Sequence, residues 1–177
     1  IIHENIYTYY SNVEFITSLE SSVVTFDCAF ICNNSSEHLD YATRLAEMGV
    51  DLFIEKPLAT SSKGVDRLQQ IVHENSLVAA VGFQTKYSDI YLKLKNIIET
   101  SEVPPNHVFS RWLTFLPDWH PYEDYKQSYA AKKNSGGGVA ATLLHELDML
   151  YTLLPNLELA NFVSGNFTSI GIEADEY

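Results

Sequence analysis

A lysine and a histidine stand at places in this sequence where they could stabilise an anion and move a proton. Lys56 follows the apolar run 50–54, between Glu55 and Pro57. His145 lies in an apolar stretch that follows three consecutive glycines. A histidine supplies a base with a pKa near neutrality, and a lysine ammonium stabilises a nearby anion.

Each of these features also has a structural interpretation. A Glu-Lys-Pro tripeptide can occur at a surface turn, and a buried histidine can simply be hydrogen-bonded in a core. A Glu-Lys pair at the end of an apolar run is nevertheless costly to bury unless it is partnered or used. Pro57 allows a cis peptide bond at this point.

Small polar side chains follow two other apolar runs. The segment 33–38 (NNSSEH) follows the run 27–32, and Gln84 follows the run 77–83. Such residues at the start of a helix can donate hydrogen bonds to an anionic or ribose ligand. A capped loop without a ligand explains the same residues equally well.

The glycines at 136–138 open a predicted helix at 139–154 that carries a polar stripe. Thr142, His145 and Asp148 recur in it at steps of three, which places them along one side of the helix. Glycines permit close backbone approach and positive φ. The HExxH pattern of zinc enzymes is absent, and His145 with Asp148 supplies too few ligands, so we predict no metal site.

Alternating strands and helices must position these residues. The pattern predicts strands at 27–33, 50–55 and 77–83, and helices after Ser35 or Ser36, after Ser61 or Ser62, and at 88–100. The strands are continuously apolar, which indicates burial on both faces. Short links between them imply a parallel sheet, and ligands bind such sheets at the carboxyl ends of the strands.

The pattern changes after Pro104 and Pro105. Residues 107–116 alternate like a strand, residues 117–135 are polar and aromatic without a period, and residues 157–172 indicate one or two further strands. We therefore predict an α/β fold class, with a domain boundary near 103–106.

Four segments taken in order resemble the glucose–fructose oxidoreductase / inositol dehydrogenase / MocA (Gfo/Idh/MocA) family of NAD(P)-dependent oxidoreductases. They are NNSSEH, GVDLFIEKPLA, VGFQTKY and GGGVAATLLHELD. The resemblance covers nearly the whole chain but only part of the family pattern. Family members begin with a strand, a G-x-G-x-x-G turn and a helix, and this sequence has no such glycine motif.

The resemblance implies a truncated chain with two parts. Residues 1–104 would be the C-terminal part of a dinucleotide-binding (Rossmann) domain, with a third strand at 5–10 and a helix opening at 13–16. Residues 105–177 would begin an α+β domain for substrate binding and oligomerisation, built on an antiparallel sheet. The chain would thus start after the first strands and stop early in the second domain.

The resemblance also implies site residues. NAD or NADP would contact Asn33, Asn34, Ser35, His38, Glu55, Lys56, Pro57 and Gln84. Lys56 would reach the substrate hydroxyl, and His145 would act as general base or acid while a hydride passes to or from the nicotinamide. The implied reaction is dehydrogenation of a secondary alcohol of a sugar, nucleotide sugar or cyclitol.

The substrate side of the site departs from the family pattern in one respect. Many members carry an Asp about one turn before the catalytic histidine, where Thr142 is nearest here, and Asp148 is a candidate replacement. The segment 116–125 resembles the substrate loop of a subgroup acting on sugars, although a packed aromatic surface loop is the alternative. The implied substrate-binding set is Lys56, Trp119, His120, Tyr122, Tyr125, Thr142, His145 and Asp148, with His120 a second acid–base candidate.

Composition excludes other classes of protein. The 177 residues contain 11 Lys+Arg against 23 Asp+Glu, a net charge of −12, which argues against nucleic-acid or anionic-membrane partners. No apolar run approaches the roughly 20 residues of a membrane span, and no signal peptide is recognisable. Cys28 and Cys32 would lie about 13 Å apart on one strand face, too far for a disulfide. We interpret them as buried small hydrophobes in a reduced, cytoplasmic protein.

Two hypotheses remain open at this stage. The first is an NAD(P)-dependent dehydrogenase that binds a small sugar-like substrate and assembles as a homo-oligomer, a dimer or tetramer as the family implies. The second is a non-catalytic relative or fragment that acts as a binding or assembly module. The missing glycine turn favours the second hypothesis, and the combination of Lys56 and His145 favours the first.

Overall fold

The computed structural model describes residues 13, 16–19, 25–103 and 105–176. The strand expected at 5–10 lies outside the described residues. So does the helix opening expected at 13–16, apart from residues 13 and 16 themselves, neither of which is helical.

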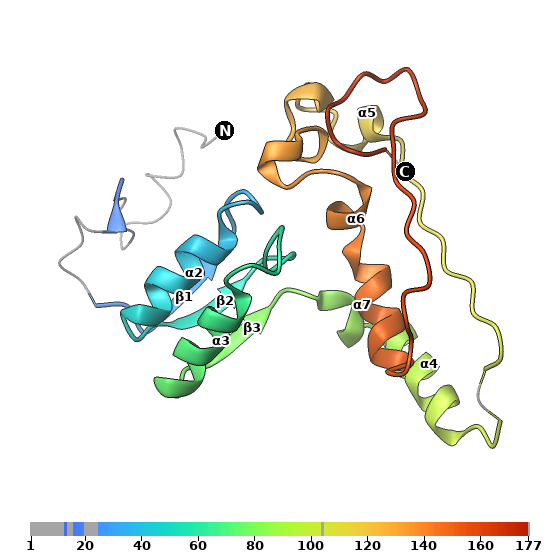
Figure 1. Ribbon diagram of the computed structural model, residues 1–177, viewed down its shortest axis with the longest axis horizontal. Coiled ribbons are helices and arrows are strands. Elements are labelled where there is room, and N and C mark those ends of the chain that lie inside the picture. The colour runs from blue at the N-terminus through green and yellow to red at the C-terminus, as the bar shows by residue number, and fades with distance from the viewer. Residues whose placement is uncertain (1–12, 14–15, 20–24, 104, 177) are drawn as a thin grey trace.

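A parallel sheet of three strands forms the first part of the described chain (Figure 1). Its strands are β1 (Cys28–Ile31), β2 (Asp51–Ile54) and β3 (Ala79–Val81), in that order across the sheet. Helices α2 (His38–Glu47) and α3 (Val65–Glu74) connect them. The strands lie within the three predicted apolar runs, so the predicted parallel α/β sheet is confirmed.

One face of this sheet carries the core. Its buried residues are Ile31, Ala42, Leu45, Ala46, Val50, Leu52, Ile54 and Leu68, contributed by the sheet, by the loop before β2 and by α2 and α3. On the other face Phe30 pairs in register with Phe53, and Phe30 is 73% exposed. The prediction of burial on both faces is therefore wrong for the described residues, because α2 and α3 cover the same side of the sheet (Figure 1).

The exposure of the two cysteines follows from the covering of only one face of the sheet. Cys28 and Cys32 are free and exposed. The prediction that they form no disulfide is confirmed, and the prediction that they are buried is wrong. They share strand parity with Phe30, and residues at steps of two point to the same face, which here is the uncovered one.

The first two helices begin later than their serines predict. The N-cap residues are Glu37 for α2 and Gly64 for α3, and neither makes a side-chain capping bond. Helix α4 (Asp89–Thr100) begins as predicted, with the Ser88 hydroxyl accepting a hydrogen bond from the Tyr91 N–H. The two serine pairs thus predicted a helix in each case but not its first residue, whereas the third helix starts close to the expected residue 88.

Helices α4, α6 (Val139–Thr142) and α7 (Leu144–Leu153) form a second part of the molecule, beside the sheet (Figure 1). The 3-10 turn η2 (Gln84–Tyr87) leads from β3 into α4, which packs against α7. Between α4 and α6 lie α5 (Leu116–Trp119), η3 (Tyr125–Gln127), η4 (Tyr129–Ala131) and η5 (Lys133–Ser135). Because α4 packs on α7, a helix that precedes the predicted boundary contributes to the second part, and the boundary near 104 stays a prediction.

The segments 107–115 and 157–167 are extended but join no ladder in the described structure. The strands predicted at 107–116 and 157–172 are therefore not formed there, and the antiparallel sheet is not observed among the described residues. A strand without a partner leaves its backbone N–H and C=O groups unpaired. Alternation of apolar residues marks a segment that can pair, but a partner must be present for the strand to form.

Candidate active site

The polar residues predicted to bind a ligand follow the three strands at one edge of the sheet. Asn33 follows β1, Glu55 and Lys56 follow β2, and Gln84 opens η2 after β3. The Lys56-Pro57 peptide bond is cis. The Glu55 carboxylate lies over Gly82, since Glu55 Oε2 would be 3.0 Å from a Cβ added there. The structure thus collects these predicted residues at the carboxyl edge, where parallel sheets bind ligands.

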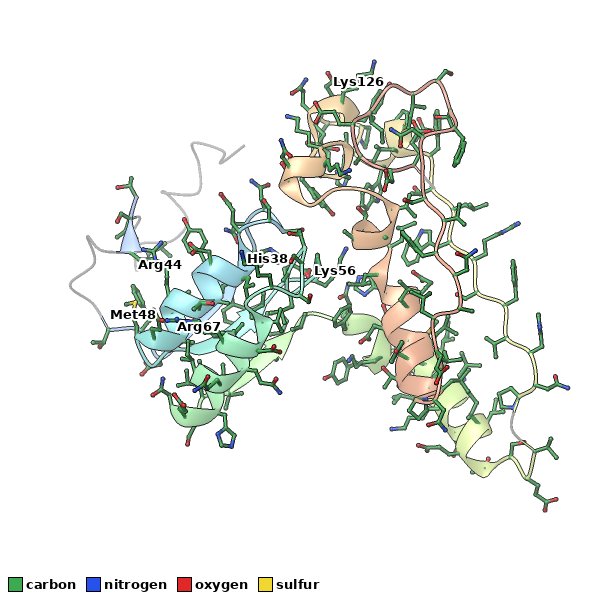
Figure 2. All side chains as sticks on the ribbon, viewed as in Figure 1. His38, Arg44, Met48, Lys56, Arg67 and Lys126 are labelled. Carbon is green, nitrogen blue, oxygen red and sulfur yellow. The ribbon has the colours of Figure 1, made fainter. Side chains whose placement is uncertain are left out.

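His38 connects the loop after β1 with the loop after β2. Its ring is 1% exposed, with Nδ1 2.7 Å from the Pro57 carbonyl oxygen and Nε2 3.1 Å from that of Asn33. Figure 2 shows His38 in the same region as Lys56. The structure gives His38 a positioning role between the Asn33 loop and the loop at Pro57, and its predicted contact with a cofactor stays a prediction.

The triple glycine brings the second part of the molecule against this edge. Gly136 has a φ of +81°, and a Cβ there would lie 2.7 Å from Thr60 Cγ2 and 2.8 Å from Ser35 Cβ. Only glycine fits such an approach without displacement of its neighbours. Ser35 is consequently buried against the glycine turn, while Asn34 stays exposed.

A break in the predicted 139–154 helix creates the contact between the two parts. Helix α6 ends at Thr142, and α7 begins at Leu144 after Leu143, whose φ and ψ of −101° and 33° are not helical. The Lys56 ammonium donates a hydrogen bond of 2.7 Å to the Thr142 carbonyl oxygen at this break. Lys56 therefore bridges the sheet edge and the helix that carries His145.

His145 lies in the first turn of α7, beside Lys56. Its side chain is 7% exposed, and the ring stands edge-on to Phe83 with centroids 6.0 Å apart. Burial lowers the pKa of His145, and the nearby Lys56 ammonium lowers it further. Carboxylates nearby, that of Glu146 foremost, oppose this shift. The imidazole is consequently biased toward the neutral form, which is the form a general base needs.

Lys56 itself is half-buried. Burial lowers its pKa from the ordinary lysine value, while the carboxylates of Glu55 and Glu146 raise it. A lysine in such surroundings is close to opposite charges on both sides of the site. It can act on a developing oxyanion.

Three polar side-chain atoms are buried without a hydrogen-bond partner in the described part of the chain. They are Thr142 Oγ1, His145 Nδ1 and Glu146 Oε2. Buried polar atoms are normally paired, and all three fall within five consecutive residues beside Lys56. Such a group of unsatisfied atoms is what a binding site for a polar ligand presents.

Asp148 is engaged elsewhere. Its carboxylate lies 3.3 Å from the ammonium of Lys86, which also stands over the Phe83 ring. The proposal from the sequence that Asp148 binds substrate or orients His145 stays untested. The geometry gives it a partner in η2 instead.

The predicted aromatic residues divide into two groups. Trp119, His120 and Tyr122 stack in a column, and His120 Nδ1 lies 2.7 Å from Glu123 Oε1. The Tyr125 hydroxyl donates to the carbonyl oxygen of Ile170, so it ties this segment to the C-terminal one. Their predicted binding of substrate is untested.

A mainly apolar cavity of about 180 Å³ lies beside α6. Trp119 and Thr142 both line it, so one aromatic residue of the predicted loop shares a cavity with one residue of the polar stripe. The cavity brings these two predicted substrate residues together, whereas Tyr122 remains 74% exposed.

Sequence reasoning missed several residues of this site. Glu146, Phe83 and Lys86 were not singled out as site residues, and neither was Tyr129, whose pKa is raised by burial and by the carboxylates of Glu55 and Glu123. Phe83 and Lys86 flank Gln84 at the end of β3, so their position was a usable signal. Glu146 was missed because it falls outside the stripe at steps of three that singled out Thr142, His145 and Asp148.

The described residues contain no group of three His, Cys, Asp or Glu side chains arranged to hold a metal ion. In the same part of the chain, every helix is too short or too polar to cross a bilayer.

The structure is a parallel α/β fold that gathers polar side chains at the carboxyl edge of its sheet. The model of the "Oxidoreductase family, NAD-binding Rossmann fold" (GFO_IDH_MocA) matches residues 4–83. The match is to the Gfo/Idh/MocA family, as the four motifs predicted.

Curated relatives agree with this assignment. The uncharacterised oxidoreductase YrbE of Bacillus subtilis is 26% identical over 77% of this chain and 39% of its own length. Inositol 2-dehydrogenase of Salmonella typhimurium is 26% identical over 72% of this chain and 35% of its length. Myo-inositol 2-dehydrogenase of Thermotoga maritima is 24% identical over 70% and 34%. The chain thus spans between a third and two-fifths of the length of these relatives.

Solved structures share the fold. An NAD-binding protein from Listeria innocua superposes with a TM-score of 0.65 at 17% identity, over 94% of this chain and 47% of that one. The WlbA dehydrogenase from Thermus thermophilus, solved with NAD and UDP-GlcNAcA, gives a TM-score of 0.61 at 17% identity, over 80% and 44%. The predicted Rossmann-like α/β class is confirmed.

Proposed function

We propose that this chain supplies the nicotinamide-facing and substrate-facing residues of an NAD(P)-dependent dehydrogenase. Its substrate would be the secondary alcohol of a sugar, nucleotide sugar or cyclitol. The observation that carries the proposal is the group of unpartnered buried polar atoms at 142–146 beside the Lys56 ammonium. The family assignment and the inositol dehydrogenases among the relatives support it.

The polar residues at the sheet edge are of the types that would contact NAD or NADP. Asn33, Glu55, Lys56 and Gln84 lie at the carboxyl edge of a parallel sheet, which is where dinucleotides bind in this fold class. NAD or NADP, when bound, supplies the carbon that accepts or donates the hydride. The chain's own residues would bind it, orient it and manage the proton.

The proton step falls to His145 and the charge to Lys56. The neutral imidazole of His145 accepts the proton of the substrate hydroxyl through one of its ring nitrogens. Its Nδ1 has no hydrogen-bond partner within the described structure. The Lys56 ammonium has one donor on the Thr142 carbonyl and two further N–H groups. One of these can hydrogen-bond the substrate oxygen as negative charge develops on it. Thr142 Oγ1 would hold a neighbouring hydroxyl.

The proposals on assembly and cellular setting rest on the resemblance to the family and on the cysteines. We propose a homo-oligomer, dimer or tetramer, and a reduced cytoplasmic setting, which the two free cysteines support. Trp119, which shares a cavity with Thr142, and Asp148 remain proposed substrate residues. His120, Tyr122 and Tyr125 remain proposed substrate residues in the aromatic loop.

One sequence observation favours a second function. The sequence carries no G-x-G-x-x-G turn, and that turn is the pyrophosphate site in dinucleotide-binding folds. A chain that lacks it can act as a binding or assembly module without turnover.

A titration with NADH and with NADPH separates the two functions. Binding is followed by quenching of tryptophan fluorescence in the chain and in the variant Lys56→Met, with Lys63→Met as an exposed control. The dehydrogenase proposal expects saturable binding that Lys56→Met weakens and Lys63→Met does not. Absence of binding by the chain supports the module, and binding that ignores Lys56→Met refutes the placement of the nicotinamide at Lys56.

A further inference from the structure

Lys86 is a cation beside the site that the proposed reaction does not use. It lies in η2, the turn that leads from β3 into α4. Its ammonium lies 3.3 Å from the Asp148 carboxylate on α7 and 5.3 Å from the centroid of the Phe83 ring. One ammonium therefore contacts both a helix of the second part of the molecule and an aromatic residue just after β3.

The ion pair between Lys86 and Asp148 is partly shielded from water. The Lys86 side chain is 28% exposed and the Asp148 side chain 18% exposed. Water and salt screen such a pair less than they screen a pair on the open surface. The two residues stand 62 positions apart in the chain, and η2 packs against α7. The pair therefore fastens α7 to the turn that follows β3.

His145 lies between two such contacts along the chain. Thr142, three residues before it, accepts the hydrogen bond from Lys56. Asp148, three residues after it, accepts the one from Lys86. Lys56 follows β2 and Lys86 follows β3, so both lysines come from the carboxyl edge of the sheet. The beginning of α7 is thus held to that edge on both sides of the imidazole.

The Phe83 ring adds a third contact to this arrangement. The His145 imidazole stands edge-on to it, with centroids 6.0 Å apart, which is a favourable geometry for two aromatic rings. The Lys86 ammonium lies over the same ring, where the ring quadrupole attracts a cation. Phe83 therefore contacts both the cation and the imidazole.

We propose that Lys86 is a positioning residue for His145. It acts through Asp148 on α7 and through the Phe83 ring, and it does not touch the reacting atoms. This inference rests on the proposed dehydrogenase function, in which His145 moves the proton. A general base works only within hydrogen-bond reach of the proton that it takes, so a residue that fixes the helix and the ring beside His145 contributes to the reaction. The pair engages Oδ1 of Asp148, which leaves the substrate contact proposed for Asp148 to Oδ2.

NMR spectroscopy of the chain tests the inference without any cofactor. A nuclear Overhauser cross-peak between the imidazole protons of His145 and the ring protons of Phe83 reports their contact. The cross-peak is expected to be lost in Lys86→Met, which removes the charge from a side chain of similar length. It is expected to persist in Lys93→Met, which removes an exposed cation of α4. A cross-peak that keeps its intensity in Lys86→Met overturns the inference.

Two further variants separate the ion pair from simple packing. Lys86→Arg keeps a cation that can pair with a carboxylate and lie over an aromatic ring, so it is expected to keep the cross-peak. Asp148→Asn removes the partner charge and is expected to lose the cross-peak, as Lys86→Met does. Loss of the cross-peak in Lys86→Arg, or its retention in Asp148→Asn, also overturns the inference.

A double variant tests whether the two residues act as one pair. If they do, Lys86→Met combined with Asp148→Asn shifts the midpoint of urea unfolding no further than the more destabilising single change. Additive shifts of the midpoint contradict the pair. Both measurements are made without NADH or NADPH. Loss of the cross-peak in a chain that binds neither cofactor therefore upholds the positioning of His145 while the dehydrogenase proposal fails.

Discussion

Replacement of His38 by alanine is expected to loosen the edge of the sheet where the site is built. The imidazole lies between the carbonyl oxygens of Pro57 and Asn33, at 2.7 and 3.1 Å. Alanine fills neither position, so two loops that converge on Lys56 lose the side chain that joins them. The variant therefore tests whether the site depends on this buried ring.

The size of the effect follows from one hydrogen bond and the volume of the ring. Each neutral tautomer of the imidazole carries one N–H, which donates to only one of the two carbonyl oxygens. Its loss leaves a carbonyl oxygen without that partner, at about 1–3 kcal/mol where the contact is buried, as it is at Pro57. The cavity left by the ring adds a further ~1 kcal/mol. We expect a loss of about 2–4 kcal/mol in the free energy of unfolding.

Urea unfolding followed by far-UV circular dichroism measures this loss. His73→Ala is the matched control, because His73 is an exposed histidine in the last turn of α3, and it is expected to cost less than about 0.5 kcal/mol. His38→Asn keeps one amide donor and is expected to fall between the two. If His38→Ala costs no more than His73→Ala, the reasoning that the ring joins the two loops is refuted.

Three further expectations concern the glycine turn and the two candidate catalytic groups. Gly137→Ala places a Cβ on backbone atoms of η4 and is expected to lower the free energy of unfolding in urea by about 3 kcal/mol. Gly49→Ala is the control: Gly49 has a φ of +80° and no atom within 4 Å of an added Cβ, so a loss of about 1 kcal/mol is expected. Lys56→Gln removes a cation that lowers the His145 pKa, so the His145 midpoint in an NMR titration is expected to rise, while Lys63→Gln leaves it unchanged. Folding lowers the pKa of His145 from its ordinary value of 6.5, so just below pH 6.5 the unfolded chain binds more protons than the folded one. The free energy of unfolding in urea is therefore expected to fall as the pH drops below 6.5. His145→Gln is expected to remove this contribution. A stability that does not change between pH 7 and pH 5 in the parent chain, or changes identically in His145→Gln, contradicts the last expectation.

The order of strands and helices was readable because it is encoded locally. Continuous apolar runs predicted β1, β2 and β3, and the residues directly after them had to lie at the carboxyl edge in a parallel sheet. That is why Asn33, Lys56 and Gln84 were placed correctly without any tertiary information.

Local patterns failed where a partner decides the outcome. The extended segments 107–115 and 157–167 alternate as strands do, yet their ladder partners are not in the described structure. Ser35 had the chemistry of a cap, but it is buried against Gly136, and Glu37 is the N-cap residue of α2. In both cases the outcome depends on another segment of the chain.

The sequence by itself determined the α/β order, the residues at the sheet edge and the resemblance to the family. Only the tertiary structure decided which side chains meet there. Lys56 donates a hydrogen bond to the Thr142 carbonyl oxygen across 86 residues of chain. The His38 ring lies between two carbonyl oxygens, and Lys86 pairs with Asp148. Periodicity records which face of an element a residue occupies, whereas pairing between distant elements depends on how their backbones approach, and no local spacing records that.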